Sequence, residues 1–170
     1  MIQDILKARL RMRRRFFASL LGMLAGLLAP SLGAQSIDDI TLNVYKEPTC
    51  GCCVGWIEHM DDNGYSSTVH HPSNLGAVKA ELGLKPEWVS CHTAVTDEGF
   101  VFEGHIPEKF IDQFLANPPQ GALGLAVPGM PIGGPGMEMG DQFTPYDILL
   151  INKDGSSSVF ASIKSIDEQH

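Results

Sequence analysis

Three of the four cysteines of this chain lie within four residues, at Cys50, Cys52 and Cys53, and the fourth, Cys91, directly precedes His92. Thiols placed this closely suit two kinds of chemistry. They can exchange between dithiol and disulfide, or they can bind a metal ion that prefers sulfur. A purely structural set of disulfides is less favoured, because a chain of this length can bury an adequate core without cross-links.

Cys50 and Cys53 have the CxxC spacing of a redox-active pair. At the start of a helix, the free backbone N–H groups and the helix dipole favour the thiolate form that exchange requires. Two features argue against simple exchange. Cys52 would be a third thiol inside the motif, able to scramble a disulfide. Thioredoxins also carry a proline at the turn opposite the dithiol, where this chain has a Ser-Cys-His sequence that ends at His92.

A metal site requires the two cysteine segments to meet, with Cys91 and His92 facing the helix that carries the other three cysteines. Adjacent residues such as Cys52 and Cys53 do not easily chelate one tetrahedral ion, but they can bridge separate ions, which favours a polynuclear thiolate cluster. Soft sulfur ligands select Cu(I). Zinc is the alternative, although structural zinc sites favour two separate CxxC pairs. The usual spacings of iron–sulfur clusters are absent.

The stretch 121–140 is rich in glycine, proline and methionine, and it supplies two further candidate metal ligands, Met130 and Met137. Both methionines follow a Pro-Gly pair, which presents the thioether on a stiff turn, and thioethers are soft ligands for copper. The composition of this stretch predicts a loop without a regular helix or a central strand. Met60 is predicted to lie in the core, and His105 to cap a helix or form a hydrogen bond in the core.

The elements that position these residues are predicted from alternation, helical spacing and turn residues. Strands are predicted at 40–46, 65–71, 93–95 and 100–102, and helices at 50–62, 74–82 and 107–115. A last hairpin is predicted from 146–152 and 157–162, followed by frayed residues. His59 on the first helix is expected to face solvent. The order β-α-β-α-β-β-α resembles the plan of thioredoxins, in which a cysteine pair begins the helix after the first strand.

The first 35 residues have the features of an export signal. Positions 7–15 are basic, 16–28 are apolar but too short to span a membrane, and small residues follow up to Ala34. The stretch 13–17 also resembles a twin-arginine signal. We therefore expect a signal peptide at 1–35 and a single domain at 36–170, with membrane contact only transiently through the signal. An uncleaved membrane anchor is the alternative.

The region after the predicted signal is strongly acidic. It contains six lysines, no arginine and 19 aspartates and glutamates, a formal charge of −13. A surface of this kind cannot neutralise phosphates, so binding to nucleic acid is not expected.

Four motifs together resemble the CopG-type periplasmic copper-handling proteins, a family first described as a domain of unknown function: VYKEPTCGCCVGWIEHM, SCHTAV, EGHIP and VPGMPIGGPGME. The resemblance covers the chain from about Leu42 to Phe160. It implies a thioredoxin-like α/β domain that binds several copper ions through the CxCC motif at Cys50–Cys53 and the pair Cys91 and His92. It also implies interconversion of Cu(I) and Cu(II) in copper resistance.

The resulting hypothesis is a periplasmic copper-binding protein of copper resistance, with a thioredoxin-like core, an added Gly/Pro/Met loop and a C-terminal hairpin. A copper oxidoreductase activity is compatible with it. Its partners would be copper ions and other periplasmic copper-efflux or redox proteins. Two alternatives stay open from the residues alone. One is a thiol–disulfide oxidoreductase acting on exported proteins, and the other is a passive copper chaperone.

Overall fold

The first strand, β1 (Thr41–Lys46), begins the part of the chain that the structure describes. The structure is a computed structural model and describes residues 40–170. Residues of β1 alternate between buried and partly exposed positions, as the sequence pattern predicts, and Leu42 and Val44 are fully buried. The predicted signal peptide and its twin-arginine stretch lie outside the described residues.

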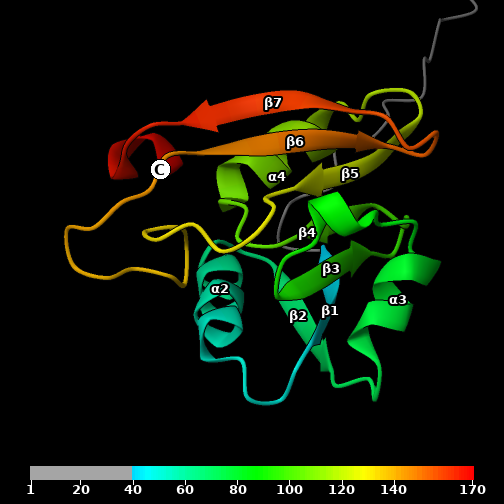
Figure 1. Ribbon diagram of the computed structural model, residues 1–170, viewed down its shortest axis with the longest axis horizontal. Coiled ribbons are helices and arrows are strands. Elements are labelled where there is room, and N and C mark those ends of the chain that lie inside the picture. Colours follow the sequence, from blue (N-terminus) through cyan, green and yellow to red (C-terminus); the bar gives the residue numbers. More distant parts are fainter. Residues whose placement is uncertain (1–39) are drawn as a thin grey trace, which may run out of the picture. The chain divides into compact units, whose positions relative to one another are not determined.

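The strands form one seven-stranded mixed sheet in the order β2-β1-β3-β4-β5-β6-β7 (Figure 1). β1 pairs in parallel with β2 and antiparallel with β3, and β4 pairs antiparallel with β3 and in parallel with β5. β6 and β7 form the predicted C-terminal hairpin. The strands after β1 are β2 (Ser66–His70), β3 (His92–Thr96), β4 (Val101–Glu103), β5 (Ala122–Ala126), β6 (Tyr146–Asn152) and β7 (Ser157–Ile163).

Three α-helices of the described region connect these strands: α2 (Gly51–Asp62), α3 (Leu75–Glu81) and α4 (Glu108–Ala116). Helix α3 begins where the sequence predicts, because the Asn74 side chain accepts a hydrogen bond from the Ala77 N–H at 3.0 Å and so satisfies a free donor of the first turn. The order of elements through α4 is β-α-β-α-β-β-α, so the predicted α/β class is confirmed.

Two apolar clusters pack on opposite faces of the sheet. Helices α2 and α4 contribute to the larger cluster, which includes the fully buried Met60, as predicted. The smaller cluster includes Trp88 from the 3-10 helix η2 (Pro86–Trp88). Val101 and Phe102 are neighbours on β4 and belong to different clusters, because successive side chains of a strand point to opposite faces.

The prediction that 121–140 contains no central strand is wrong. β5 occupies Ala122–Ala126 and lies between β4 and β6 in the sheet. Leu125 and Ala126 are fully buried, so the segment is stabilised by packing rather than by strand propensity. Gly124 is required there, because a Cβ at this position would collide with the Val101 carbonyl of β4. A glycine that lowers strand propensity thus permits a close approach of two strands.

The expectation of frayed residues after the hairpin is also wrong. The chain after β7 forms the 3-10 helix η3 (Ile166–Gln169), and Gln169 is buried. Its side-chain oxygen accepts a hydrogen bond from the Tyr146 hydroxyl at 2.7 Å, and its amide donates to the Gly133 carbonyl at 2.8 Å. This side chain therefore ties the end of the chain to β6 and to the loop that precedes it.

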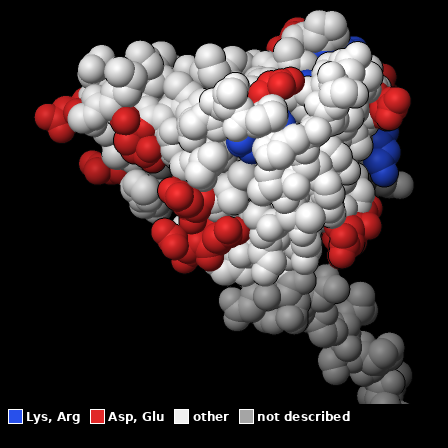
Figure 2. Space-filling model, turned by 90° about the horizontal axis from the view of Figure 1, so that it is seen from below, with Lys and Arg blue, Asp and Glu red and all other residues white. Residues whose placement is uncertain are grey.

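Acidic side chains outnumber basic ones on the face of the molecule shown in Figure 2, in keeping with the charge of the sequence. Within residues 40–170, no helix has the length and apolar character needed to cross a membrane.

Candidate metal centre

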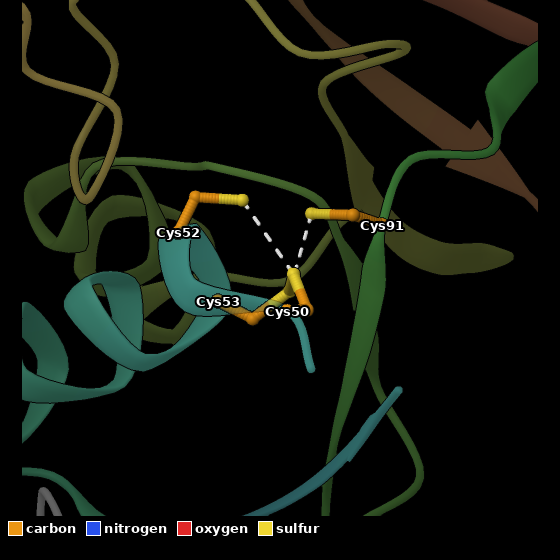
Figure 3. Close-up of side chains that lie close together, drawn as sticks. All are labelled: Cys50, Cys52, Cys53 and Cys91. Carbon is orange, nitrogen blue, oxygen red and sulfur yellow. Dashed lines mark hydrogen bonds between the residues drawn. A yellow bond between two sulfur atoms is a disulfide. The ribbon is translucent and has the colours of Figure 1, made fainter. Parts of the chain in front are cut away.

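Three of the cysteines lie at the start of α2, one just before the helix and two in its first turn. Cys50 is the residue that precedes the helix, and its side chain makes no capping hydrogen bond. Cys50 and Cys53 form a disulfide, with their Cα atoms 5.5 Å apart. Cys52 is a free thiol whose Sγ lies 3.5 Å from the Sγ of Cys50 (Figure 3). A third thiol therefore lies beside a closed disulfide, as the spacing of the motif predicted.

Cys91 faces this turn from the residue before β3. Its Sγ lies 3.4 Å from the Sγ of Cys53, and both Cys91 and Cys52 point toward the disulfide in Figure 3. The four sulfur atoms all lie within 4.8 Å of one another. The predicted meeting of the two cysteine segments is confirmed, and the cluster could bind a metal ion. Reduction of the disulfide by two electrons and two protons would provide four thiols for this purpose.

Two imidazoles extend the cluster on the side of Cys91. The Nδ1 atom of His92 lies 3.4 Å from the Cys91 sulfur, and the Nε2 atom of His105 lies 3.1 Å from it. One ligand atom from each of these three residues lies within 4.8 Å of the others. Cys91 therefore belongs to both a four-sulfur group and a Cys-His-His group.

The comparison with known proteins agrees with this arrangement. A family model described as "Protein of unknown function, DUF411" matches residues 88–137. No curated protein matches the chain. A solved structure titled "Copper resistance protein copG- Form 1" is 39% identical, with a TM-score of 0.69, over 74% of this chain and 98% of that chain. Form 2 is 38% identical, with a TM-score of 0.68 and the same coverage.

The chain belongs to the CopG family of copper resistance proteins. The match to the solved structure covers most of the described residues. The segment that matches the DUF411 family model, residues 88–137, includes Cys91, His92 and His105.

In this CopG-family protein, His105 belongs to the Cys-His-His group, whereas the sequence predicted a helix cap or a core hydrogen bond for it and left contact with a metal open. The residue does form a buried hydrogen bond, since its Nδ1 lies 2.8 Å from the Pro135 carbonyl. A carbonyl only accepts, so Nδ1 carries the proton and the Nε2 lone pair points to Cys91. The EGHIP sequence contains this residue, but only the pairing of β3 with β4 brings it beside Cys91.

The protonation of these groups is set mainly by burial. Burial, helped by the nearby His105 and Lys79, lowers the pKa of His92 well below its usual value, and burial also lowers the pKa of His105. Both imidazoles are therefore neutral near pH 7, which is the form that binds metals. Burial, with a smaller effect of Cys52, raises the pKa of Cys91 to about 12. A bound metal ion would have to displace this proton.

The Gly/Pro/Met loop, which is the part of the stretch that follows β5 (residues 127–140), lies against both cysteine segments through its backbone. A Cβ at Gly136 would come within 2.5 Å of the Cys52 carbonyl, and the Gly129 carbonyl accepts a hydrogen bond from the Ser90 hydroxyl beside Cys91. The loop residues that follow these two glycines are the predicted ligands, with Met137 half-buried and Met130 58% exposed. Metal binding by their thioethers stays a prediction.

The remaining histidine prediction that the structure tests concerns His59. This side chain does not simply face solvent, because it is 16% exposed and its Nε2 accepts a hydrogen bond from the Glu108 N–H at 3.2 Å. The imidazole therefore satisfies a free donor at the start of α4. His59 lies outside the two groups of candidate ligands.

Proposed function

We propose that this protein binds several copper ions as Cu(I) in a thiolate cluster formed by Cys50, Cys52, Cys53 and Cys91. The observation that most strongly supports this proposal is that these four sulfur atoms lie within 4.8 Å of one another. Four thiolates this close can each bridge two ions, and adjacent cysteines favour bridging over chelation of one ion. Sulfur donors prefer Cu(I) over harder ions, and zinc is the competing cargo.

The histidines complete the site on the side of Cys91. His92 and His105 are neutral and buried, so each can present a lone pair without first losing a proton. Imidazole binds both Cu(I) and Cu(II), whereas thiolates favour Cu(I). A site that joins the two ligand types through Cys91 can therefore accommodate both oxidation states. Met130 and Met137 are proposed as further ligands, or as groups that pass copper to and from the cluster.

A redox role follows from the disulfide. Two Cu(II) ions can each accept one electron from a reduced Cys50–Cys53 pair, which releases two protons and closes its S–S bond. In the reverse direction, two Cu(I) ions and two protons reopen the pair and leave two Cu(II) ions and two thiols. The balance is two electrons in each direction, and an external dithiol reductant can reset the pair. This would make the protein a copper oxidoreductase.

The fold and compartment proposals support the same function. The sheet order β2-β1-β3-β4, with β1 and β2 parallel and β3 antiparallel, supports a thioredoxin-like core extended by β5, β6 and β7. The name of the similar solved structures supports a role in copper resistance. The basic and apolar pattern of residues 1–35 supports export to the periplasm, where other copper-efflux or redox proteins are the proposed partners.

The test is an anaerobic titration of the fully reduced protein with Cu(I) in competition with a chromophoric chelator. We expect more than one Cu(I) per chain and a lower stoichiometry in Cys52→Ser. Met139→Leu is a matched control, because this methionine is exposed in the same loop but is not a predicted ligand. A stoichiometry below two, or an unchanged value in Cys52→Ser, contradicts the cluster. A parallel titration with Zn(II) decides between the two metals.

The Cys50–Cys53 disulfide at the start of α2 favours a second candidate, a thiol–disulfide oxidoreductase acting on exported proteins. An insulin-reduction assay separates the two functions. Turnover that survives Cys52→Ser and Cys91→Ser but is lost in Cys50→Ser supports the oxidoreductase. A passive copper chaperone uses the same ligands, and stopped-flow oxidation of bound Cu(I) by an electron acceptor distinguishes it from a redox enzyme.

A further inference from the structure

A buried ion pair lies behind the strand that carries Cys91 and His92. Lys79 of α3 is 7% exposed and Glu103 of β4 is fully buried, and the Lys79 Nζ lies 2.5 Å from the Glu103 Oε1. Removing two charges from water is costly, and an apolar pair of similar size often gives equal or greater stability. A buried ion pair is therefore weak evidence for a stabilising role, and the hydrogen bonds of these two residues suggest another one.

Glu103 contacts the ligand-bearing segment on both sides of its two ligands. Its Oε1 accepts a hydrogen bond from the Ser90 N–H at 2.5 Å, and its Oε2 accepts one from the Thr93 hydroxyl at 2.5 Å. Lys79 adds a hydrogen bond to the Thr93 Oγ1 at 2.9 Å. Cys91 and its neighbouring histidine lie between these two anchors. Hydrogen bonds to charged groups are stronger than neutral ones, so the anchors are firm.

Ser90 is held from two further directions. Its hydroxyl donates to the Gly129 carbonyl of the Gly/Pro/Met loop. Gly104 packs so closely that an added Cβ would come within 2.7 Å of the Ser90 Cβ, and its N–H donates to the His92 carbonyl at 3.1 Å. The segment 90–93 is thus fixed by β4 on one side and by the loop before Met130 on the other.

We propose that the Lys79–Glu103 pair is a positioning device, which holds the Cys91 sulfur within reach of the α2 cysteines. The inference deepens the proposed function, since it rests on Cys91 being a copper ligand. A ligand that is already in place does not have to be ordered when the metal binds, and loss of a group that orients a ligand typically lowers metal affinity by about 10- to 100-fold. Neither residue contacts the metal in this proposal.

The decisive experiment measures the position of Cys91 without copper. In a Cys50→Ser/Cys52→Ser background, only Cys53 and Cys91 remain, with sulfur atoms 3.4 Å apart in the parent structure. The equilibrium constant for their disulfide against glutathione reports the effective concentration of the two thiols. Lys79→Met/Glu103→Met removes the charges and the acceptors. Lys79→Met/Glu103→Gln removes the charges but keeps an oxygen that can accept the Ser90 N–H.

We expect the Met/Met variant to lower this equilibrium constant by about tenfold or more, and the Met/Gln variant to recover only part of the loss, because its neutral amide oxygen accepts a weaker hydrogen bond from the Ser90 N–H. Tyr65→Phe is the structural control, because it removes a hydrogen bond to Asp112 away from the cluster and should leave the constant unchanged. If the Met/Met variant does not fold, Thr93→Val takes its place, because it removes only the hydrogen bonds of the Thr93 hydroxyl. It should lower the equilibrium constant by roughly threefold, which is less than the tenfold loss expected when both anchors are removed.

A folded Met/Met variant with the parent's equilibrium constant overturns the proposal, as does an equal loss in Tyr65→Phe. The same substitutions in the four-cysteine protein should lower the Cu(I) affinity by about 10- to 100-fold. A parent that binds no copper would overturn the proposed function and leave the glutathione result to decide the positioning role. The two failures are therefore distinguishable.

Discussion

The cysteines at the start of α2 and the ligands beside β3 and β4 are held in the structure by different means. Cys50 has no side-chain capping bond, and Cys52 is half-buried beside the disulfide. On the other side, His92 and His105 are fully buried, and the backbone around Cys91 is anchored by Glu103. Cys53 is itself fully buried, but its disulfide partner Cys50 and the free thiol Cys52 are half-buried. The side with the α2 cysteines is therefore the more open one, and the side with the two enclosed imidazoles is the closed one.

This difference assigns separate tasks to the two sides. Disulfide exchange requires sulfur atoms that can move between partners, and the first turn of a helix provides three of them within four residues. Metal selectivity requires ligands that keep their geometry when the ion is absent, and buried, hydrogen-bonded groups provide this. Cys91 belongs to both sides, since its sulfur contacts Cys53 and His105.

The largest expected effect tests whether Cys91 links the two sides. Cys91→Ser should lower the Cu(I) affinity by at least about a hundredfold, because Cys91 is a ligand in both the four-sulfur group and the Cys-His-His group. Even the loss of a residue that only orients a ligand lowers metal affinity by about 10- to 100-fold. Cys52→Ser, which touches one group, should cost less. Anaerobic competition with a chromophoric Cu(I) chelator measures both. A greater loss in Cys52→Ser would show that the four-sulfur side binds copper without its connection to the histidines.

The next effect concerns the contact between the loop and α2. Gly136 has a φ of +78°, and a Cβ there would collide with the backbone nitrogen of Trp56 and the Cys52 carbonyl oxygen. Gly136→Ala should lower the free energy of unfolding by about 2–4 kcal/mol, through backbone strain and displacement of the loop. Gly140→Ala is the matched control, since its φ is +60° but nothing lies within 4 Å of the added Cβ. If urea unfolding shows an equal loss of free energy of unfolding in both variants, the loop is not packed against α2 at Gly136.

The buried histidines predict a smaller, pH-dependent effect on the copper-free protein. Because the pKa of His92 is lowered in the folded state, the unfolded chain takes up a proton below about pH 6.5 that the folded chain does not. The free energy of unfolding should therefore fall as the pH drops below 6.5, by up to about 1.4 kcal/mol per pH unit for this group.

Urea unfolding between pH 5 and 7.5 measures that slope. His92→Gln should reduce it without abolishing it, because burial also lowers the pKa of His105 and of His59. His71→Gln, at an exposed position, should retain the slope of the parent. If the free energy of unfolding of the parent does not change with pH, His92 is charged or solvated in the folded protein. Water would then reach the two imidazoles.

The smallest effect tests the loop methionines. Met137→Leu and Met130→Leu should each lower the Cu(I) affinity by only a few-fold, because a thioether adds a weak ligand to an existing thiolate site. Met139→Leu, exposed in the same loop, should have no effect. The chelator competition measures all three variants. Equal affinities in all of them would remove the loop from the ligand set and restrict it to covering the site.

The sequence predicted the parts of this structure that depend on local patterns. Alternation identified β1, helical spacing and the Asn74 cap identified α2 and α3, and the element order placed Cys91 opposite the CxCC turn. β5 was missed because its glycine lowers strand propensity, and only the neighbouring strands show that the segment is buried. Propensity describes a residue alone, whereas β5 is stabilised by contacts on both sides.

The core hydrogen bond that the sequence offered for His105 is confirmed, but its place beside Cys91 was not predicted, for a similar reason. It lies 14 residues from Cys91, and only the antiparallel pairing of β3 with β4 brings it to 3.1 Å from that sulfur. Gln169 was missed because its partners lie on β6 and in the loop. Contacts that join distant segments leave no periodic signal in the sequence.

The candidate cysteine and histidine ligands come from three stretches, around residues 50–53, 91–92 and 105, and the loop that packs on them at Gly136 comes later still. A partly made or unfolded chain therefore offers copper only a local trio of thiols, without the imidazoles. Binding energy available only to the finished fold acts as folding energy. In a protein that carries copper in this way, uptake is a late step, and retention of the ion marks a chain that has matured correctly.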